Sequence, residues 1–279
     1  MNVTWEMPPE PPREPLGVGG IVRALARGIV LGTLVFGGLM LMLLIRLVER
    51  PIYGVRRPLT PFLTQFVCRN AFRILGIEFR HRGTPMQERG AVVANHSSWL
   101  DIFTLNATKR IYFVSKAEVA GWPGIGWLAR ATGTVFIKRD RKDAKLQQQI
   151  FEDRLLAGHK LLFFPEGTST DSMVVLPFKT TLFQAFFHEH LRHEMHIQPV
   201  TVIYRAPEGA DPRYYGWWGD MEFGPHLLKV LAARRQGSVE VVYHPPVRVD
   251  AYANRKVLAA EMEATVRGAM PPERRGPSH

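Results

Sequence analysis

The stretch Ala91-Val92-Val93-Ala94-Asn95-His96-Ser97-Ser98-Trp99-Leu100-Asp101 decides how this chain is interpreted. Its first four residues form a short apolar run, as expected of a buried strand, and a histidine and an aspartate follow with a spacing of five. A strand that ends in this way brings an imidazole to the edge of a sheet, where a short turn can return Asp101 to the ring. The carboxylate then fixes one ring nitrogen as a donor and leaves the other free to accept a proton.

This pair has no serine nucleophile beside it in a recognisable motif. The nearest candidate to Gly-x-Ser-x-Gly is Gly167-Thr168-Ser169-Thr170-Asp171, which lacks the second glycine. A His–Asp pair without a serine favours a base that acts directly on the hydroxyl group of a substrate. An isolated pair of this spacing also fits a helix cap followed by a solvated acid, so the interpretation depends on the rest of the chain.

Two later stretches supply that context, Gly133-Thr134-Val135-Phe136-Ile137-Lys138-Arg139 and Phe163-Phe164-Pro165-Glu166-Gly167-Thr168-Ser169. Together with the first stretch and the segment Ile197–Thr201 around Pro199, they occur in the order of the blocks of a known family. The chain resembles the bacterial glycerophospholipid acyltransferases, which include 1-acylglycerol-3-phosphate and lyso-ornithine lipid acyltransferases. The resemblance covers the chain from about Cys68 to about Tyr204.

The resemblance implies transfer of a fatty acyl group from a thioester to the hydroxyl of a lysolipid. Such a reaction needs a base, for which His96 is the candidate, with Asp101 orienting the ring and stabilising the imidazolium. The family pattern implies a substrate-binding set made of Lys138, Arg139, Glu166, Gly167 and Thr168. A guanidinium suits a phosphate because its fork holds two oxygens. Lys179 follows this loop and is expected to add charge near the phosphate.

The alternation of patterns predicts the fold class. Apolar runs at 77–81, 91–95, 111–115, 134–138, 160–164, 197–204 and 239–243 alternate with helical patterns at 99–107, 117–131, 143–157 and 182–191. This order predicts an α/β domain with a single largely parallel or mixed sheet flanked by helices. Chemistry in such sheets gathers at the carboxyl ends of strands, so His96, Arg139 and Glu166 are expected to converge.

The N-terminal part predicts a membrane-associated helical element. Residues 28–45 are uncharged and almost wholly apolar, and as a helix they span about 27 Å at ~1.5 Å per residue, enough for a thin hydrocarbon core. Arginines are denser on the C-terminal side, which favours the inner membrane with the catalytic domain facing the cytoplasm. Both flanks are basic, so a re-entrant or interfacial helix remains an alternative. Apolar residues between Leu63 and Leu75 recur at helical spacing and predict an amphipathic helix.

The domain plan follows from these patterns. Residues 1–20 are expected to be a disordered, proline-rich tail, 21–76 a membrane-anchoring helix plus an amphipathic helix, 77–270 the catalytic domain, and 271–279 a flexible tail.

The charge of the chain points to an acidic partner. A formal net charge of +11 and an isoelectric point near 10.1 fit an anionic membrane surface or an acidic carrier protein. Basic residues are spread along the chain without a nucleic-acid-binding module, so nucleic acid is not expected as a partner. Only Cys68 is present, which excludes an internal disulfide. The acyl donor is expected to be an acyl carrier protein or acyl-CoA, which is a co-substrate, and no cofactor is expected.

Several acceptors and activities stay open at this level. The first choice of acceptor is 1-acylglycerol-3-phosphate, which gives phosphatidate in phospholipid synthesis, and the alternative is a lyso-ornithine lipid. A non-catalytic protein that binds anionic lipid would use the same basic site. A metal-dependent hydrolase would need the cluster His188, His190, His193 and His196, but this cluster lacks the His-Glu-x-x-His spacing, so no metal is expected.

Overall fold

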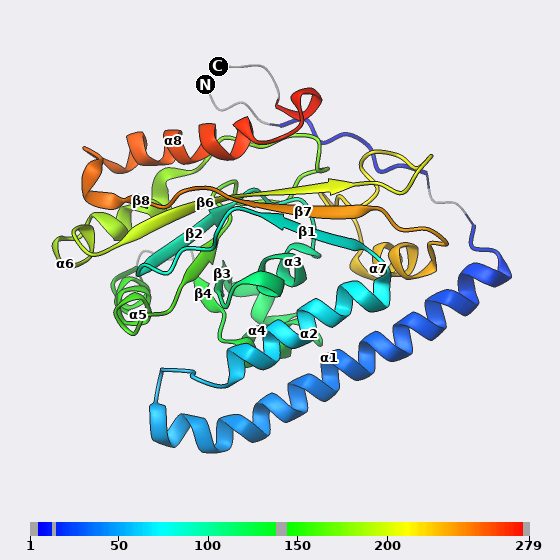
Figure 1. Ribbon diagram of the computed structural model, residues 1–279, viewed down its shortest axis with the longest axis horizontal. Coiled ribbons are helices and arrows are strands. Elements are labelled where there is room, and N and C mark those ends of the chain that lie inside the picture. The colour runs from blue at the N-terminus through cyan, green and yellow to red at the C-terminus, as the bar shows by residue number, and fades with distance from the viewer. Residues whose placement is uncertain (1–4, 13–14, 138–143, 276–279) are drawn as a thin grey trace.

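The computed structural model describes residues 5–12, 15–137 and 144–275, and its centre is one mixed eight-stranded sheet in the order β1-β7-β6-β2-β5-β3-β4, with β8 paired to β6 (Figure 1). The strands are β1 (Glu78–Arg82), β2 (Gly90–Ala94), β3 (Tyr112–Lys116), β4 (Val135–Ile137), β5 (Leu161–Phe163), β6 (His196–Arg205), β7 (Ser238–Tyr243) and β8 (Val247–Arg248). β2 to β6 run parallel to one another, whereas β7 is antiparallel to β6 and parallel to β1. The sheet confirms the predicted fold class.

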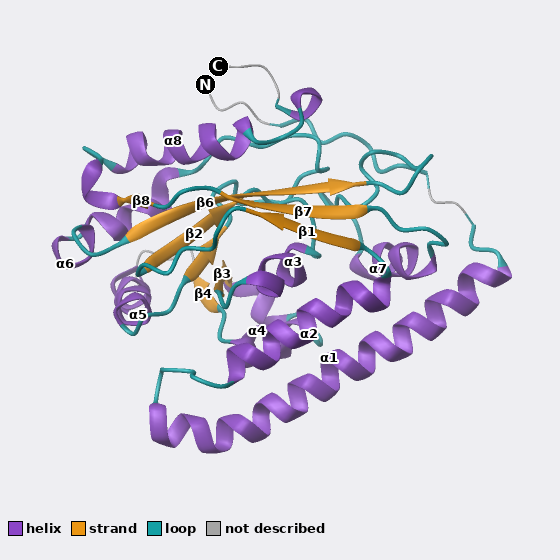
Figure 2. Cartoon of the chain, in the orientation of Figure 1, coloured by secondary structure: helices purple, strands orange, loops and turns teal. Residues whose placement is uncertain are grey.

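Helices cover both faces of the sheet (Figure 2). The α-helices are α1 (Val18–Tyr53), α2 (Thr60–Leu75), α3 (Asp101–Thr108), α4 (Ile125–Thr132), α5 (Ala144–Leu156), α6 (Glu189–Arg192), α7 (Phe223–Ala232) and α8 (Arg255–Gly268), and the 3-10 helices are η1 (Ala117–Gly121), η3 (Thr180–Phe187), η4 (Val249–Ala251) and η5 (Pro272–Arg274).

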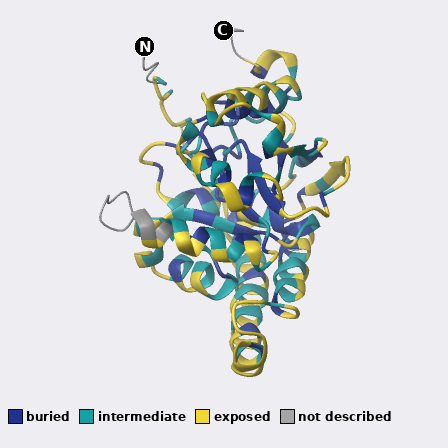
Figure 3. Cartoon of the chain, turned by 90° about the vertical axis from the view of Figure 1, so that its left-hand side faces the viewer, coloured by how far each residue is buried: buried dark blue, intermediate teal, exposed yellow. Residues whose placement is uncertain are grey.

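Successive side chains of a strand point alternately into two hydrophobic cores, one on each face of the sheet. In β2, Val92 and Ala94 pack with residues of α1, α2, α3 and α7, whereas Ala91 and Val93 pack with residues of α5, η3 and α8. This period of two explains why β2 is a continuous apolar run, because a parallel strand is buried on both faces. Figure 3 shows the buried residues gathered in the strands at the middle of the molecule.

Helix α1 is longer than the apolar run that predicted it. It begins at Val18, inside the segment expected to be a disordered tail, and continues through Pro51 near its last turn to Tyr53. Within the part of the chain that the structure describes, α1 is the one helix whose length and composition could cross a membrane. It packs along α2, α7 and α4 and buries a stripe that contains Gly20, Ala24, Leu31, Met42 and Glu49. The opposite face exposes large apolar side chains, among them Leu25, Ile29, Val30, Met40, Leu41, Leu44, Leu47 and Val48.

Two arginines of α1 form hydrogen bonds that connect this helix to the catalytic domain. Arg23 donates to the carbonyl of Ala232 at 2.9 Å, and Arg27 donates to Leu231 and Ala233 at 3.0 and 2.7 Å, at the end of α7. Cations are favourable there because the last carbonyls of a helix carry partial negative charge. These two basic residues, which the sequence presents as a flank of the apolar run, are therefore tied to protein carbonyls. The segment before α1 is also in contact with the catalytic domain, because the indole N–H of Trp218 donates to the carbonyl of Pro8 at 2.9 Å.

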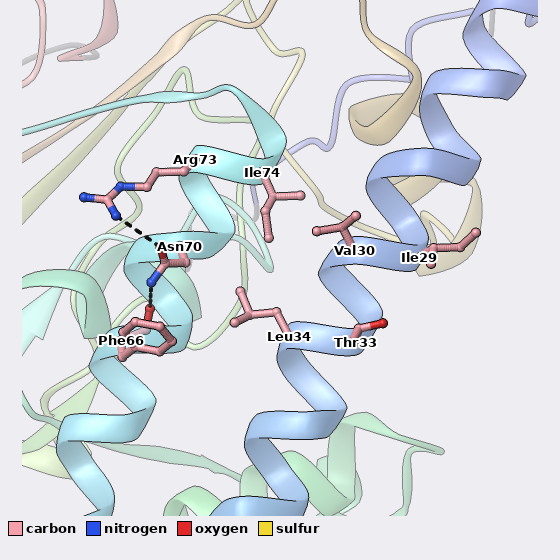
Figure 4. A pocket seen from close by; sticks show the side chains of 8 residues that line it. All are labelled: Ile29, Val30, Thr33, Leu34, Phe66, Asn70, Arg73 and Ile74. Atoms are coloured by element: carbon pink, nitrogen blue, oxygen red, sulfur yellow. Dashed lines mark hydrogen bonds between the residues drawn. The ribbon is translucent and has the colours of Figure 1, made fainter.

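Helices α1 and α2 meet closely at one point and enclose a groove beside it. A Cβ on Gly38 would lie 2.7 Å from Val67 Cγ2, so this contact needs the missing side chain of glycine. Toward the start of α1 the groove has a volume of about 590 Å³ (Figure 4). Its lining consists of Ile29, Val30, Thr33, Leu34, Phe66, Asn70, Arg73 and Ile74.

Two predicted helices differ from the structure. The helix expected over 117–131 is divided into η1 and α4, because Pro123 and the positive φ of Gly124, +71°, interrupt the backbone between them. The helix expected over 182–191 is the 3-10 helix η3 followed by the short α6. Helices α7 and α8 and strand β8 are further elements that the sequence patterns did not predict.

Candidate active site

The predicted residues His96 and Glu166 lie at one edge of the sheet. β2 and β5 are adjacent parallel strands, and each of these residues follows the carboxyl end of its strand. The tight turn after β2 is closed by the bond from Asp101 N–H to Ser98 O at 3.1 Å, and α3 begins at Asp101. This turn returns the carboxylate to the ring, and His96 Nδ1 lies 2.7 Å from Asp101 Oδ2.

Asp101 is held by several donors. Besides the imidazole, its Oδ2 accepts the backbone N–H groups of Ser97 and Ser98 at 2.9 and 3.1 Å. Its Oδ1 accepts the hydroxyl of Tyr204 at 2.7 Å. The side chain of Asp101 is 0% exposed, so the carboxylate depends on these donors in place of water. The contacts fix the direction in which it faces His96.

The ring of His96 is held at its face and at one nitrogen. It stacks on Phe164 with the ring centroids 4.0 Å apart and the planes 10° from parallel. Within the described residues, the bond at Nδ1 is the only hydrogen bond of the ring, and the side chain is 22% exposed. Because Asp101 accepts at Nδ1, that nitrogen carries the hydrogen and Nε2 is left with its lone pair. The arrangement suits a general base.

Glu166 points into the protein. It is 1% exposed, its Oε1 accepts the backbone N–H of His96 at 2.6 Å, and its Oε2 accepts that of Leu176 at 2.7 Å. Burial raises the pKa of Glu166 to about 8, against the opposing effect of the two N–H donors. The side chain therefore ties the loop after β5 to the backbone of His96.

The loop after Glu166 carries the other predicted contacts. Gly167 has a φ of +74°, and a Cβ there would lie 2.7 Å from Lys179 Nζ, so the lysine crosses directly over this glycine. The backbone N–H of Lys179 also donates to Pro165 O at 2.9 Å. Thr168 is exposed on the same loop. Lys138 and Arg139 lie outside the described residues.

Three residues around the pair were not singled out as site residues by the sequence analysis. Asn95 exchanges hydrogen bonds with the backbone of Val202, at 2.9 Å to its carbonyl and 2.8 Å from its N–H, and so fixes β2 against β6. Trp99 donates to His226 Nδ1 at 2.9 Å, and burial lowers the pKa of His226 to about 3, so that histidine is a neutral acceptor. Tyr204, which contacts Asp101, lies 103 positions away, and local periodicity gives no sign of such a contact.

Among the described residues, the other candidate nucleophiles and the histidine cluster do not form a second reactive site. Ser97 and Ser98 are 1% and 0% exposed and cannot reach a substrate. Burial raises the pKa of the Cys68 thiol to about 12, so it is not a reactive thiolate. His190 and His193 face Glu152 and Asp250 separately, and within residues 5–12, 15–137 and 144–275 no group of three or more His, Cys, Asp or Glu side chains has metal-site geometry.

A His–Asp pair at the carboxyl edge of a mixed sheet has the geometry of a general base that could act on a hydroxyl group. The family model for acyltransferases matches residues 75–203. The chain is 58% identical over 95% of its length to a lyso-ornithine lipid O-acyltransferase of Rhodobacter capsulatus, covering 96% of that relative. It is 39% identical to one of Brucella abortus, with 78% of this chain and 83% of the relative covered.

A solved structure shares the fold. The crystal structure of the 1-acyl-sn-glycerophosphate acyltransferase of Thermotoga maritima matches with a TM-score of 0.62 and 20% identity, covering 89% of this chain and 94% of that one. The chain therefore belongs to the acyltransferase family. It is an enzyme that acylates lysolipids, as the sequence predicted.

Proposed function

We propose that this protein is a lyso-ornithine lipid O-acyltransferase in which His96 and Asp101 are the catalytic pair. The observation that carries the reaction is the 2.7 Å bond between His96 Nδ1 and Asp101 Oδ2, which leaves Nε2 free. The choice of acceptor is supported by the 58% and 39% identical relatives, both of which bear that name. Lysophosphatidate is the first choice of acceptor from the sequence alone, and the names of these relatives favour the lyso-ornithine lipid instead.

The geometry suggests direct transfer. Nε2 of His96 takes the proton of the acceptor hydroxyl while that oxygen attacks the carbonyl carbon of the thioester. Asp101 stabilises the imidazolium that forms. The tetrahedral intermediate then collapses, the carbon–sulfur bond breaks, and the leaving thiolate recovers the proton from His96. The products are the ester and a free thiol, and no acyl-enzyme is formed.

The loop after β5 is the proposed support for the head group. An ornithine head carries a carboxylate, which a lysine can pair with as readily as a phosphate. Lys179 lies over Gly167 at this loop, and Thr168 is exposed beside it. We assign Gly167, Thr168 and Lys179 to acceptor binding and keep Lys138 and Arg139 as further proposed contacts. Glu166 belongs to the site through its bond to the backbone of His96.

Helix α1 supplies the proposed membrane contact. It packs along α7, α2 and α4 through one stripe and exposes apolar side chains on the other side, so we propose that it lies within one leaflet along the membrane surface. The membrane is proposed to be the inner membrane, with the catalytic domain in the cytoplasm. The donor is proposed to be an acyl thioester of an acyl carrier protein or CoA, and the acidity of a carrier protein would suit the net charge of +11.

A competition between acceptors tests this function. The purified protein in vesicles receives one labelled acyl thioester together with equal amounts of lyso-ornithine lipid and lysophosphatidate, first with CoA and then with carrier protein as the donor. We expect the label mainly in ornithine lipid. Label mainly in phosphatidate would overturn the acceptor assignment, and label in neither lipid would overturn the proposed function.

A further inference from the structure

The last described turn of the chain reaches the back of the candidate active site. Arg274 lies in η5, within the segment 271–279 that the sequence predicts to be a flexible tail, yet it is only 7% exposed. Its Nη1 donates to the carbonyl of Tyr204 at 2.6 Å and, over a longer distance of 3.5 Å, to that of Ser172. Arg274 is far outside residues 75–203, which match the family model.

The first of these carbonyls belongs to the residue that holds Asp101. The Tyr204 hydroxyl donates to Asp101 Oδ1 at 2.7 Å, and it lies 2.9 Å from the hydroxyl of Thr104. Burial and the charge of Asp101 both raise the pKa of Tyr204, so the phenol keeps its proton and remains a donor. Tyr204 is 1% exposed and lies at the end of β6. A bond to its carbonyl therefore fixes the position from which the hydroxyl reaches Asp101.

The second carbonyl belongs to the turn that holds His96. Thr170 donates to His96 O from both its backbone N–H and its hydroxyl, at 2.9 and 3.2 Å. Two residues later, Ser172 has a φ of +72°, a left-handed conformation that is unfavourable for a non-glycine residue. Such a turn persists only where its surroundings hold it. The guanidinium of Arg274 supplies one such contact.

We infer that Arg274 is a positioning residue that sets His96 and Asp101 relative to each other, through the Ser172 turn on one side and Tyr204 on the other. This inference rests on the proposed function, because it takes His96 and Asp101 as the reacting pair. Both bonds come from Nη1, whose two N–H groups can serve one carbonyl each, and the planar guanidinium fixes the direction of these groups, whereas a lysine ammonium rotates freely. Arg274 itself does not touch substrate.

Steady-state kinetics of Arg274→Ala and Arg274→Lys test the inference. We expect kcat to fall roughly 10- to 100-fold in Arg274→Ala while KM for the acceptor stays within about twofold, because loss of a charged donor to buried acceptors affects alignment rather than binding. Arg274→Lys should recover part of kcat. Arg275→Ala is the matched control, because the exposed Arg275 guanidinium donates to Met270 O at 2.9 Å and makes no described contact with Tyr204 or Ser172, so kcat should be unaffected.

Two further measurements separate positioning from general stability. In protein labelled with ¹⁵N-histidine, the Nδ1–H resonance of His96 should move in Arg274→Ala at a temperature where the variant is fully folded. The double variant Arg274→Ala/Tyr204→Phe should lose no more activity than the more damaged single variant, because both changes act on one network.

The outcomes that overturn the inference are distinct from failure of the proposed function. If folded Arg274→Ala keeps the kcat of the native protein, or if its loss of activity equals its loss of folded protein, Arg274 has no positioning role. His96→Ala is assayed alongside. If that variant remains active, the proposed catalytic pair is wrong and the inference falls with it. If His96→Ala is inactive while Arg274→Ala is normal, only the inference about Arg274 fails.

Discussion

Replacing Asp101 with asparagine removes one negative charge beside His96 and nearly preserves the shape of the side chain. The site should keep its geometry, because three donors converge on Oδ2, namely His96 Nδ1 and the N–H groups of Ser97 and Ser98, and they select the amide oxygen of asparagine. The amide nitrogen would then face the Tyr204 hydroxyl, which can turn to accept it. The tautomer of His96 is therefore retained, and the charge is the main loss.

The expected loss of rate can be estimated from the attraction between the Asp101 carboxylate and the His96 imidazolium. The contact atoms are 2.7 Å apart, and the centres of the two delocalised charges are taken as ~4 Å apart. At that separation and an effective dielectric constant of ~20, two unit charges attract by ~4 kcal/mol. Since each ~1.4 kcal/mol is a factor of ten in rate, the rate constant of acyl transfer in Asp101→Asn should fall roughly 10³-fold.

The assay is the initial rate of transfer of a labelled acyl group from its thioester at saturating acceptor. Asp153→Asn, an exposed aspartate on α5, is the matched control and should have the native rate. A folded Asp101→Asn variant that keeps more than a tenth of the native rate would refute the argument that the buried carboxylate stabilises an imidazolium.

Two other predictions concern the loop after β5. The pKa of Glu166 is raised from 4.5 to about 8, so the folded protein retains a proton that the unfolded chain loses, and the free energy of unfolding should decline as the pH rises from 4.5 to 8. Glu166→Gln cannot titrate, so its free energy of unfolding, measured in urea at several pH values, should fall less over this range than that of the native protein. If the native protein instead becomes more stable relative to the variant as the pH rises from 4.5 to 8, the carboxylate is ionised in the folded state and the prediction is wrong. Gly167→Ala adds a Cβ at a φ of +74° against Lys179 Nζ, so KM for the acceptor should rise several-fold. Gly158→Ala is the control, because Gly158 also has a positive φ, +84°, but an added Cβ there would have no atom within 4 Å, so KM should be unchanged. If the two variants have equal KM values, Lys179 is not part of the head-group site.

Local sequence patterns were enough for much of the sheet. The apolar runs before His96 and Glu166 became β2 and β5, because parallel strands buried on both faces need continuous apolar residues. The rule that chemistry gathers at the carboxyl ends of parallel strands placed these two residues at one edge. The spacing of five between His96 and Asp101 was also informative, since a single short turn separates them.

The rest depended on contacts between distant parts of the chain. The bonds from Tyr204 to Asp101 and from Arg274 to Tyr204 join residues that are 103 and 70 positions apart, and no local periodicity reports them. Arg27 resembled the flank of a membrane segment, but its partners are carbonyls at the end of α7. A basic residue beside an apolar run can thus face lipid head groups or protein carbonyls, and only the folded structure distinguishes these two environments.

The most direct test of the central claim is the single-turnover rate of His96→Ala beside the native protein, with lyso-ornithine lipid as the acceptor in vesicles. Loss of a general base costs typically 10²- to 10⁴-fold, so we expect a rate at least roughly 100-fold below the native one in a variant that is still folded at the assay temperature and binds the acceptor as the native protein does. A folded His96→Ala variant that transfers the acyl group at the native rate would contradict the assignment of His96 as the base.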